Sequence, residues 1–349
     1  MRRLGLILAG SLIATSACAP TLPINAELPV QAENPVSADP AAEYANALAG
    51  PGAPYREGYV GEGDNRIHYV EAGEGPTVLF VHGFPSFWYV WRDQMEALRH
   101  CRRVIAIDAL GAGLSAKPKA EEAYRVEILA RRLHTLIGEL APGEKIMLVG
   151  HDWGGALAWS YVQSDASRVE RLAVFSAPSY NLLLDLLAND PEQRAASSYM
   201  PKLLEIDRQT ASTTAFAQSF FDLAYQRMLD TDVLDAREGE LFKDALHREG
   251  ALYAGIQWYK ANIPAFDNLD PASAYWPKAG TRTDVPVLLV RGAQDRTFVQ
   301  RMEFDALDEA TDLTTLTIDG VGHWTPFQEP FASNEALAEF ILGQGRTCR

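Results

Sequence analysis

The feature that most limits the fold of this chain is the alternation of short apolar runs with longer amphipathic segments. From residue 55 onward, the apolar runs end near Gly, Asp or His, and the segments between them carry apolar residues at three- and four-residue spacing. Continuously apolar runs are typical of strands buried on both faces, and amphipathic helices supply the cover. We therefore predict an α/β fold with a mostly parallel central sheet and helices on both faces. The predicted strands are 76–81, 104–107, 146–149, 172–175, 285–290 and 313–318, and the predicted helices include 88–99, 126–140, 155–162 and 335–342.

This alternation stops between residues 179 and 281, where no convincing buried strand is found. We interpret 179–281 as a helical cap inserted into a core formed by 55–178 and 282–349. Such a cap can close a largely apolar pocket over the carboxyl ends of the strands, where function gathers in parallel sheets. The segments with helical spacing inside it are 182–187, 199–206 and 216–229.

The beginning of the chain has the three regions of a secretory signal. Arg2 and Arg3 precede an apolar stretch, and small residues lead to Cys18. The apolar stretch is too short for a membrane span, which takes about 20 residues. We predict a signal peptide at 1–18 and a flexible tether at 19–54, which is rich in Ala, Pro, Asn and Glu. The protein is then exported by a bacterium, either to the periplasm or as a lipoprotein anchored through Cys18.

The charge of the chain limits its partners. The formal net charge is −15, so nucleic acid and anionic membrane surfaces would repel it. We find no His, Cys and carboxylate cluster with metal-ligand spacing. These observations favour an enzyme that acts on a small molecule without a metal or an organic cofactor, and they leave the oligomeric state open.

The strongest chemical signal is the segment Gly-His-Asp-Trp-Gly-Gly at 150–155, which lies between a predicted strand and a predicted helix. Small residues there permit a nucleophile elbow, a sharp turn that pushes the central side chain out of the sheet. That side chain is Asp152. A carboxylate is already ionised at neutral pH, so it can attack an alkyl carbon without a base to remove its proton. A helix N-cap is the structural alternative for Asp152.

Two later strands end in residues that complete a catalytic triad. The run 285–290 leads to Asp295, and the run 313–318 leads to His323 on a glycine-bearing loop. The order nucleophile, acid, histidine is the order found with a nucleophile elbow. Asp295 would orient the imidazole of His323, and His323 would deprotonate water.

The segment His-Gly-Phe-Pro at 82–85 follows another predicted strand. The backbone amides of Phe84 and Trp153 are predicted to form an oxyanion hole, and their side chains are predicted to contact substrate. A structural turn is the alternative for this loop.

These motifs resemble the epoxide hydrolase branch of the α/β-hydrolase family. The likeness lies in 82–85 followed by Trp-Tyr-Val-Trp-Arg at 88–92, in the elbow at 150–155 and in Gly-His-Trp at 322–324, and it runs from about residue 55 to the C-terminus. It implies the α/β-hydrolase fold. It also implies a small hydrophobic epoxide and water as substrates, a covalent ester on Asp152 and a vicinal diol as product.

The resemblance further implies two cap tyrosines that hold the epoxide oxygen. Tyr199 in Ser-Tyr-Met and Tyr259 in Trp-Tyr-Lys-Ala occupy the matching places. Tyr225 is a rival to Tyr199, and packing within the cap is the structural alternative for each.

Two other functions compete with this interpretation. A haloalkane or haloacid dehalogenase shares the Asp nucleophile, but Phe84 and Trp153 replace residues typical of those enzymes. A non-catalytic secreted binding protein on the same fold is disfavoured because every catalytic position is filled.

The fold that the resemblance implies also predicts a disulfide. Cys101 follows the helix predicted at 88–99, and Cys348 follows the last helix. In this fold the two helices cover the same sheet face and run in the same direction, so their ends would be neighbours. An exported protein would meet an oxidising compartment, where disulfides persist.

Overall fold

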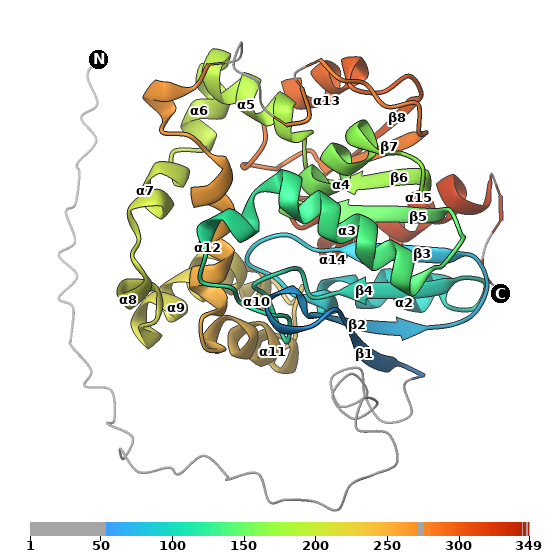
Figure 1. Ribbon diagram of the computed structural model, residues 1–349, viewed down its shortest axis with the longest axis horizontal. Helices are drawn as coiled ribbons and strands as arrows, with labels where there is room; N and C mark the ends of the chain where they lie inside the picture. Colours follow the sequence, from blue (N-terminus) through green and yellow to red (C-terminus); the bar gives the residue numbers. More distant parts are fainter. Residues whose placement is uncertain (1–53, 271–275, 279, 344, 347, 349) are drawn as a thin grey trace, which may run out of the picture. The chain divides into compact units, whose positions relative to one another are not determined.

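The computed structural model describes residues 54–270, 276–278, 280–343, 345–346 and 348. Its sheet has eight strands in the order β1-β2-β4-β3-β5-β6-β7-β8 (Figure 1). All pairs from β4 to β8 are parallel, whereas β1 pairs with β2 and β2 pairs with β4 in antiparallel fashion. The predicted mostly parallel sheet is confirmed. The strands are β1 (Arg56–Val60), β2 (Ile67–Ala72), β3 (Thr77–Val81), β4 (Arg103–Ile107), β5 (Ile146–His151), β6 (Val169–Phe175), β7 (Val287–Gly292) and β8 (Leu313–Ile318).

The two antiparallel strands were not predicted, because neither is a continuous apolar run. β1 lies at the edge of the sheet and is partly exposed. β2 alternates, and one of its buried residues is a histidine, His68. The predicted start of β7 was also wrong. Pro286 has no backbone N–H to donate, and regular pairing with β8 begins at Val287.

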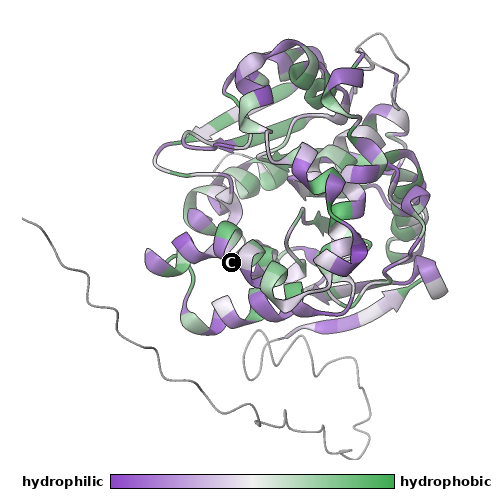
Figure 2. Cartoon of the chain, turned by 90° about the vertical axis from the view of Figure 1, so that its left-hand side faces the viewer, coloured by the Kyte–Doolittle hydropathy of each residue, from purple (hydrophilic) through white to green (hydrophobic). Residues whose placement is uncertain are grey.

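Helices cover both faces of the sheet. α3 packs against α4 on one face, and α2, α14 and α15 pack together on the other (Figure 1). Figure 2 colours the helices in alternating green and purple, as expected for elements with one apolar and one polar side. The core-covering helices and short turns are η1 (Gly63–Asn65), η2 (Trp88–Trp91), α2 (Arg92–Leu98), η3 (Glu121–Tyr124), α3 (Val126–Leu140), α4 (Trp153–Ser164), α13 (Arg301–Asp305), η6 (Ala306–Asp308), α14 (Thr325–Gln328) and α15 (Pro330–Leu342).

Between β6 and β7, every element in the described residues is helical. The first of these helices begins after Ser179, whose hydroxyl accepts a hydrogen bond from the amide of Leu182. The segment predicted as helical at 216–229 is helical throughout, as α9 and α10 joined by a π-helical turn. The elements are α5 (Tyr180–Asn189), α6 (Pro191–Ala196), α7 (Met200–Glu205), α8 (Arg208–Ala211), α9 (Thr214–Phe221), η4 (Asp222–Gln226), α10 (Arg227–Asp230), α11 (Ala236–His247), α12 (Ala251–Asn262) and η5 (Phe266–Asn268). We call α5 to α12 the cap helices.

The predicted signal peptide at 1–18, with Cys18, lies outside the described residues, as does all of the predicted tether except Pro54. Within the part of the chain that is described, no helix combines the length and the hydropathy needed to cross a bilayer.

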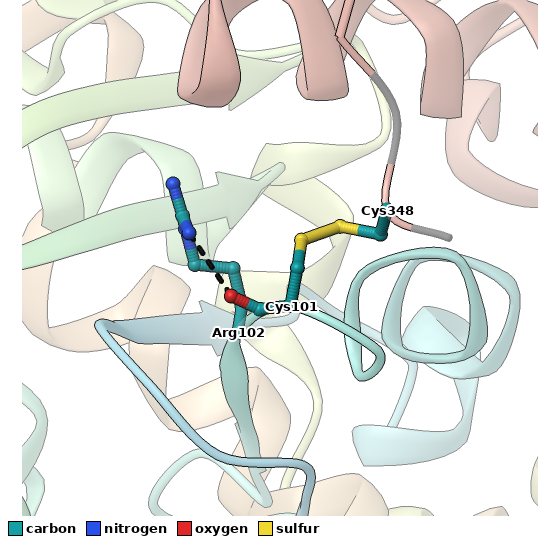
Figure 3. Close-up of a disulfide and its surroundings, with 3 residues drawn as sticks. All are labelled: Cys101, Arg102 and Cys348. Atoms are coloured by element: carbon teal, nitrogen blue, oxygen red, sulfur yellow. Dashed lines mark hydrogen bonds between the residues drawn. A yellow bond between two sulfur atoms is a disulfide. The ribbon is translucent and has the colours of Figure 1, made fainter.

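A disulfide joins Cys101 to Cys348 (Figure 3). Cys101 lies between α2 and β4, and Cys348 lies beyond α15. The two Cα atoms are 5.3 Å apart, although 247 positions separate the residues in the sequence. α2 and α15 pack against each other, so the sheet face that they share brings the two cysteines together.

Replacing both Cys101 and Cys348 by Ser should lower the free energy of unfolding by about 2–4 kcal/mol, because the unfolded chain regains the freedom that a long closed loop removes. Urea denaturation of the two oxidised proteins measures this difference. Thiol counting on denatured, unreduced wild type is the control, and two reactive thiols at these positions would exclude the bond.

Candidate active site

Asp152 lies at the turn between β5 and α4 with φ 52° and ψ −126°. A non-glycine residue rarely adopts a positive φ, and such strain persists only where the surroundings enforce it. Here close packing enforces it. A Cβ atom on Gly154 would clash with the carbonyl oxygen of Val81, and one on Gly150 would lie 2.7 Å from the Cα of Gly155. The turn therefore has the geometry of a nucleophile elbow, and the side chain of Asp152 is almost entirely buried.

His323 lies between two carboxylates. Its Nε2 is 3.5 Å from Oδ2 of Asp152, and its Nδ1 is 3.1 Å from Oδ2 of Asp295. Asp295 follows β7, and its side chain is inaccessible to solvent. The other oxygen of Asp295 accepts hydrogen bonds from the amides of Thr297, at 2.7 Å, and Phe298, at 3.3 Å. The structure thus brings together Asp152, His323 and Asp295, the three residues that the sequence predicts as a catalytic triad.

Each of these three groups shifts the pKa of its neighbours. Burial by itself would lower the pKa of His323, but Asp295 and Asp152 outweigh it and raise that pKa from 6.5 to about 10. Burial would raise the pKa of each carboxyl, yet the imidazolium holds the pKa of both below the usual value. Two carboxylates and one imidazolium therefore share this buried site at neutral pH.

The predicted oxyanion hole also lies at the nucleophile. The backbone N–H of Phe84 donates to Oδ1 of Asp152 at 2.9 Å, and the backbone N–H of Trp153 donates to the same carboxyl. Gly83 is required for this approach because a Cβ atom there would clash with Oδ1 of Asp152. The Phe84–Pro85 peptide bond is cis.

Tyr259 is buried on α12, next to the elbow that carries Asp152. Its ring packs edge-on against the rings of Trp153 and Phe84, with centroid distances of 5.1 and 5.7 Å. Hydrogen bonds to the core fix α12 on both sides of it. Trp258 donates from Nε1 to the carbonyl oxygen of Leu110 at 2.9 Å. The side chain of Asn262 bonds the backbones of Tyr124 and Val126, at 2.8 Å in each case.

Tyr199 lies at the start of α7, and its ring packs edge-on against that of Tyr259, with the centroids 6.1 Å apart. Burial, followed by the nearby charge of Asp152, raises the pKa of Tyr199; burial, followed by Tyr199 and Asp152, raises that of Tyr259. Both phenols therefore keep their protons and can donate hydrogen bonds. The rival Tyr225 donates to the carbonyl oxygen of Pro85 and stacks on Phe242, with ring centroids 4.6 Å apart. The structure places Tyr199, and not Tyr225, beside Tyr259.

One residue of the site was not singled out from the sequence. His151, directly before the nucleophile, donates from Nε2 to the carbonyl oxygen of His323 at 3.0 Å, and the two rings lie 4.9 Å apart. Burial, followed by the charge of His323, lowers the pKa of His151 to about 4, so it is neutral. Its place inside the Gly-His-Asp-Trp motif was the available signal.

A cavity adjoins Phe84 and Trp153. Leu110, Leu246 and Trp258 give it a mainly apolar lining. Gly255 of α12 lies against the ring of Phe84, where a Cβ atom would clash. Within the described ranges, no group of three or more His, Cys, Asp or Glu side chains is placed to hold a metal ion.

Known proteins share this architecture. Solved structures with the same fold include an epoxide hydrolase of Bacillus megaterium in complex with an inhibitor, with a TM-score of 0.75 and 22% identity over 82% of this chain and 100% of that one. A second, from work on epoxide hydrolases in metagenomes from hot environments, has a TM-score of 0.67 and 26% identity over 80% of this chain and 95% of that one.

Sequence comparison identifies the family. A model described as alpha/beta hydrolase fold matches residues 76–330. The AB hydrolase superfamily protein YfhM of Bacillus subtilis (strain 168) is 28% identical over 80% of this chain and 95% of its own length. Epoxide hydrolase 4 of Mus musculus is 35% identical over 80% of this chain and 77% of its own length. The chain is therefore a hydrolase of the α/β-hydrolase superfamily and belongs to its epoxide hydrolase family.

Proposed function

We propose that this enzyme hydrolyses an epoxide to a vicinal diol through a covalent ester on Asp152. The observation that carries the proposal is the pairing of an ionised carboxylate at the elbow with two protonated phenols from the cap, Tyr199 and Tyr259. An epoxide oxygen leaves as an alkoxide and needs donated hydrogen bonds, whereas a halide leaves as a stable anion. The relatives named as epoxide hydrolases support the same assignment.

In the first step, Asp152 attacks a ring carbon. Oδ1 is occupied by the amide of Phe84, so Oδ2 is the oxygen that forms the new bond as the carbon–oxygen bond of the ring breaks. A phenol of the tyrosine pair donates its proton to the alkoxide. The imidazolium of His323 restores that phenol, and His323 is left neutral.

In the second step, the neutral His323 acts as the base. Esterification removes the charge of Asp152, which is one of the two carboxylates that raise the pKa of His323. The pKa of His323 falls, so the imidazole stays neutral and is free to accept a proton from water. The hydroxide attacks the ester carbonyl, and the amides of Phe84 and Trp153 stabilise the oxyanion. When the ester bond to Oδ2 breaks, the diol oxygen takes the proton from His323. The carboxylic acid on Asp152 then returns its own proton to His323.

We also propose that the enzyme works outside the cytoplasm of a bacterium. The charged and apolar regions at the start of the sequence support export, and so does the Cys101–Cys348 disulfide, because disulfides persist in oxidising compartments.

Asp152→Asn should abolish steady turnover of epoxides, because a neutral amide is a poor nucleophile at carbon. His323→Gln should instead trap the ester, so that the intact mass rises by one substrate mass. Mass spectrometry after incubation with a small epoxide panel reads both effects. Full turnover by either variant would contradict the covalent route.

Asp152→Asn should also lower the pKa of His323, since the variant lacks one of the two charges that raise it to about 10. NMR titration of the imidazole measures this, with the half-buried Asp185→Asn on α5 as the control. In wild type, the stability that protonated His323 contributes is fully present below pH 6.5 and is lost as the pH rises through about 10. An unchanged pKa in Asp152→Asn would refute the charge coupling.

Tyr259→Phe removes one hydroxyl and should slow ester formation from an epoxide roughly 10²-fold, the scale of one well-placed acid. Tyr199→Phe should act in the same direction. Tyr124→Phe is a matched control, because its buried hydroxyl bonds the carbonyl oxygen of Pro118 away from the nucleophile. Rapid-quench measurement of the ester gives the rates. If the two single variants and the double variant keep the wild-type rate, the epoxide mechanism is wrong, and halide release from haloalkanes is the next assay.

A further inference from the structure

Gln193 on α6 is a fully buried amide that reaches from the cap to the loop after β7. Its Oε1 accepts a hydrogen bond from the amide of Val299 at 3.0 Å. Its Nε2 donates to the carbonyl oxygen of Thr297 at 2.8 Å. One cap side chain thus bonds the backbone of this loop at two positions, once as an acceptor and once as a donor.

The loop is the one that presents the acid. The amides of Thr297 and Phe298 donate to Oδ1 of Asp295, while Oδ2 faces His323. The ring of Phe298 also packs against the imidazole of His323, with centroids 5.7 Å apart. A displacement of this backbone would therefore move both groups that orient the base.

The same Nε2 of Gln193 makes a further contact toward the tyrosine pair. It donates to the hydroxyl of Ser197 at 2.9 Å, and the amide of Ser197 in turn donates to the carbonyl oxygen of Gln193 at 2.8 Å. Ser197 is fully buried and lies two residues before Tyr199. Gln193 therefore connects the segment that carries a cap phenol to the loop that carries the acid.

We propose that Gln193 is a positioning residue that sets the geometry of Tyr199 relative to the Asp295–His323 pair, and so couples the cap to both steps of the reaction. This inference rests on the proposed function, because it assigns Tyr199 to the first step and His323 to the second. Glutamine suits the role because a single amide supplies an acceptor and two donors without a charge. No other side chain of the same size offers this set to a buried backbone.

A second contact between the two regions is weaker. A guanidinium nitrogen of Arg301, just after the loop, lies 3.6 Å from Oδ2 of Asp190. Asp190 caps α6 by accepting hydrogen bonds from the amides of Glu192 and Gln193. The side chain of Arg301 is 56% exposed, and exposed ion pairs contribute little. The buried amide of Gln193 is the connection that can transmit position.

Gln193→Met keeps the length of the side chain and removes all three hydrogen bonds. Ester formation and ester hydrolysis, measured separately by rapid quench and intact mass, should each slow roughly 10-fold or more, as expected when reacting groups are misplaced. The pH profile of ester hydrolysis should move to lower pH, because a loosened Asp295 raises the pKa of His323 less.

Asn181→Leu is the matched control. Asn181 is a buried cap amide on α5 that donates to the carbonyl oxygens of Pro277 and Lys278, at 2.7 and 3.4 Å. Among the described residues, its side chain forms no hydrogen bond with the loop after β7. It should lose stability without a change in the pH profile. Equal effects of the two variants on both rates and on the profile would overturn the proposal, since a general loosening of the cap would then explain them.

Ser197→Ala provides a milder test if Gln193→Met does not fold. It removes only the contact toward Tyr199, so ester formation should slow several-fold while ester hydrolysis and its pH profile stay at the wild-type values. Slowing of hydrolysis alone, or no slowing of either step, would overturn the proposal.

One readout does not depend on epoxide turnover. In unliganded Gln193→Met, the amides of Thr297 and Phe298 should exchange with deuterium faster than in wild type or Asn181→Leu, and the pKa of His323 should be lower. If wild type forms no ester with any epoxide, the proposed function fails, while these two measurements still decide the positioning role. Unchanged exchange and an unchanged pKa would overturn it.

Discussion

The site depends on one arrangement of charge, an imidazolium held between two buried carboxylates. Burying a single charge is costly, and burying three is tolerable only when each is paired and hydrogen-bonded. His323 satisfies the pairing for Asp152 and Asp295, and backbone amides satisfy the remaining carboxylate oxygens. Three features around the site bring these charges and amides together. They are the strained elbow at Asp152, the glycine at position 83 and the loop after β7.

The two parts of the molecule contribute different chemistry. In the proposed mechanism, the carboxyl ends of the parallel strands supply the nucleophile, the acid and the base, whereas the cap helices supply the phenols. Tyr259 is fixed because α12 is bonded to the core through Trp258 and Asn262. Tyr199 lies at the start of the short helix α7. Ser197, two residues earlier, accepts a hydrogen bond from Gln193, which also bonds the loop after β7. In our proposal the two phenols are therefore positioned by different contacts, although their rings pack against each other.

The fold could be predicted largely from local pattern. The strands β3 to β6 follow from apolar runs, because burial on both faces requires such runs, and the helix α3 follows from helical spacing. β8 was also predicted, although it lies at the other edge of the sheet and is only partly buried. β1 and β2 could not be found this way. An edge strand needs little apolar sequence, and the polar His68 is tolerable inside β2 because Asp108 lies 2.8 Å from its Nδ1. That partner is distant in sequence, so no local pattern announces it.

The residues of the site divide in the same way. Asp152, Asp295 and His323 each follow a strand, and strand ends of a parallel sheet converge at one edge, so the sequence by itself determined their neighbourhood and their order. It left Tyr199 and Tyr225 as alternatives, and it contained no signal for Gln193. Only the tertiary structure shows that Tyr199, and not Tyr225, lies beside Tyr259, and it alone joins Gln193 to the loop after β7. The physical reason is that these choices depend on which hydroxyl or amide finds a buried partner across the cap–core boundary, and that packing is set by contacts between segments about a hundred residues or more apart.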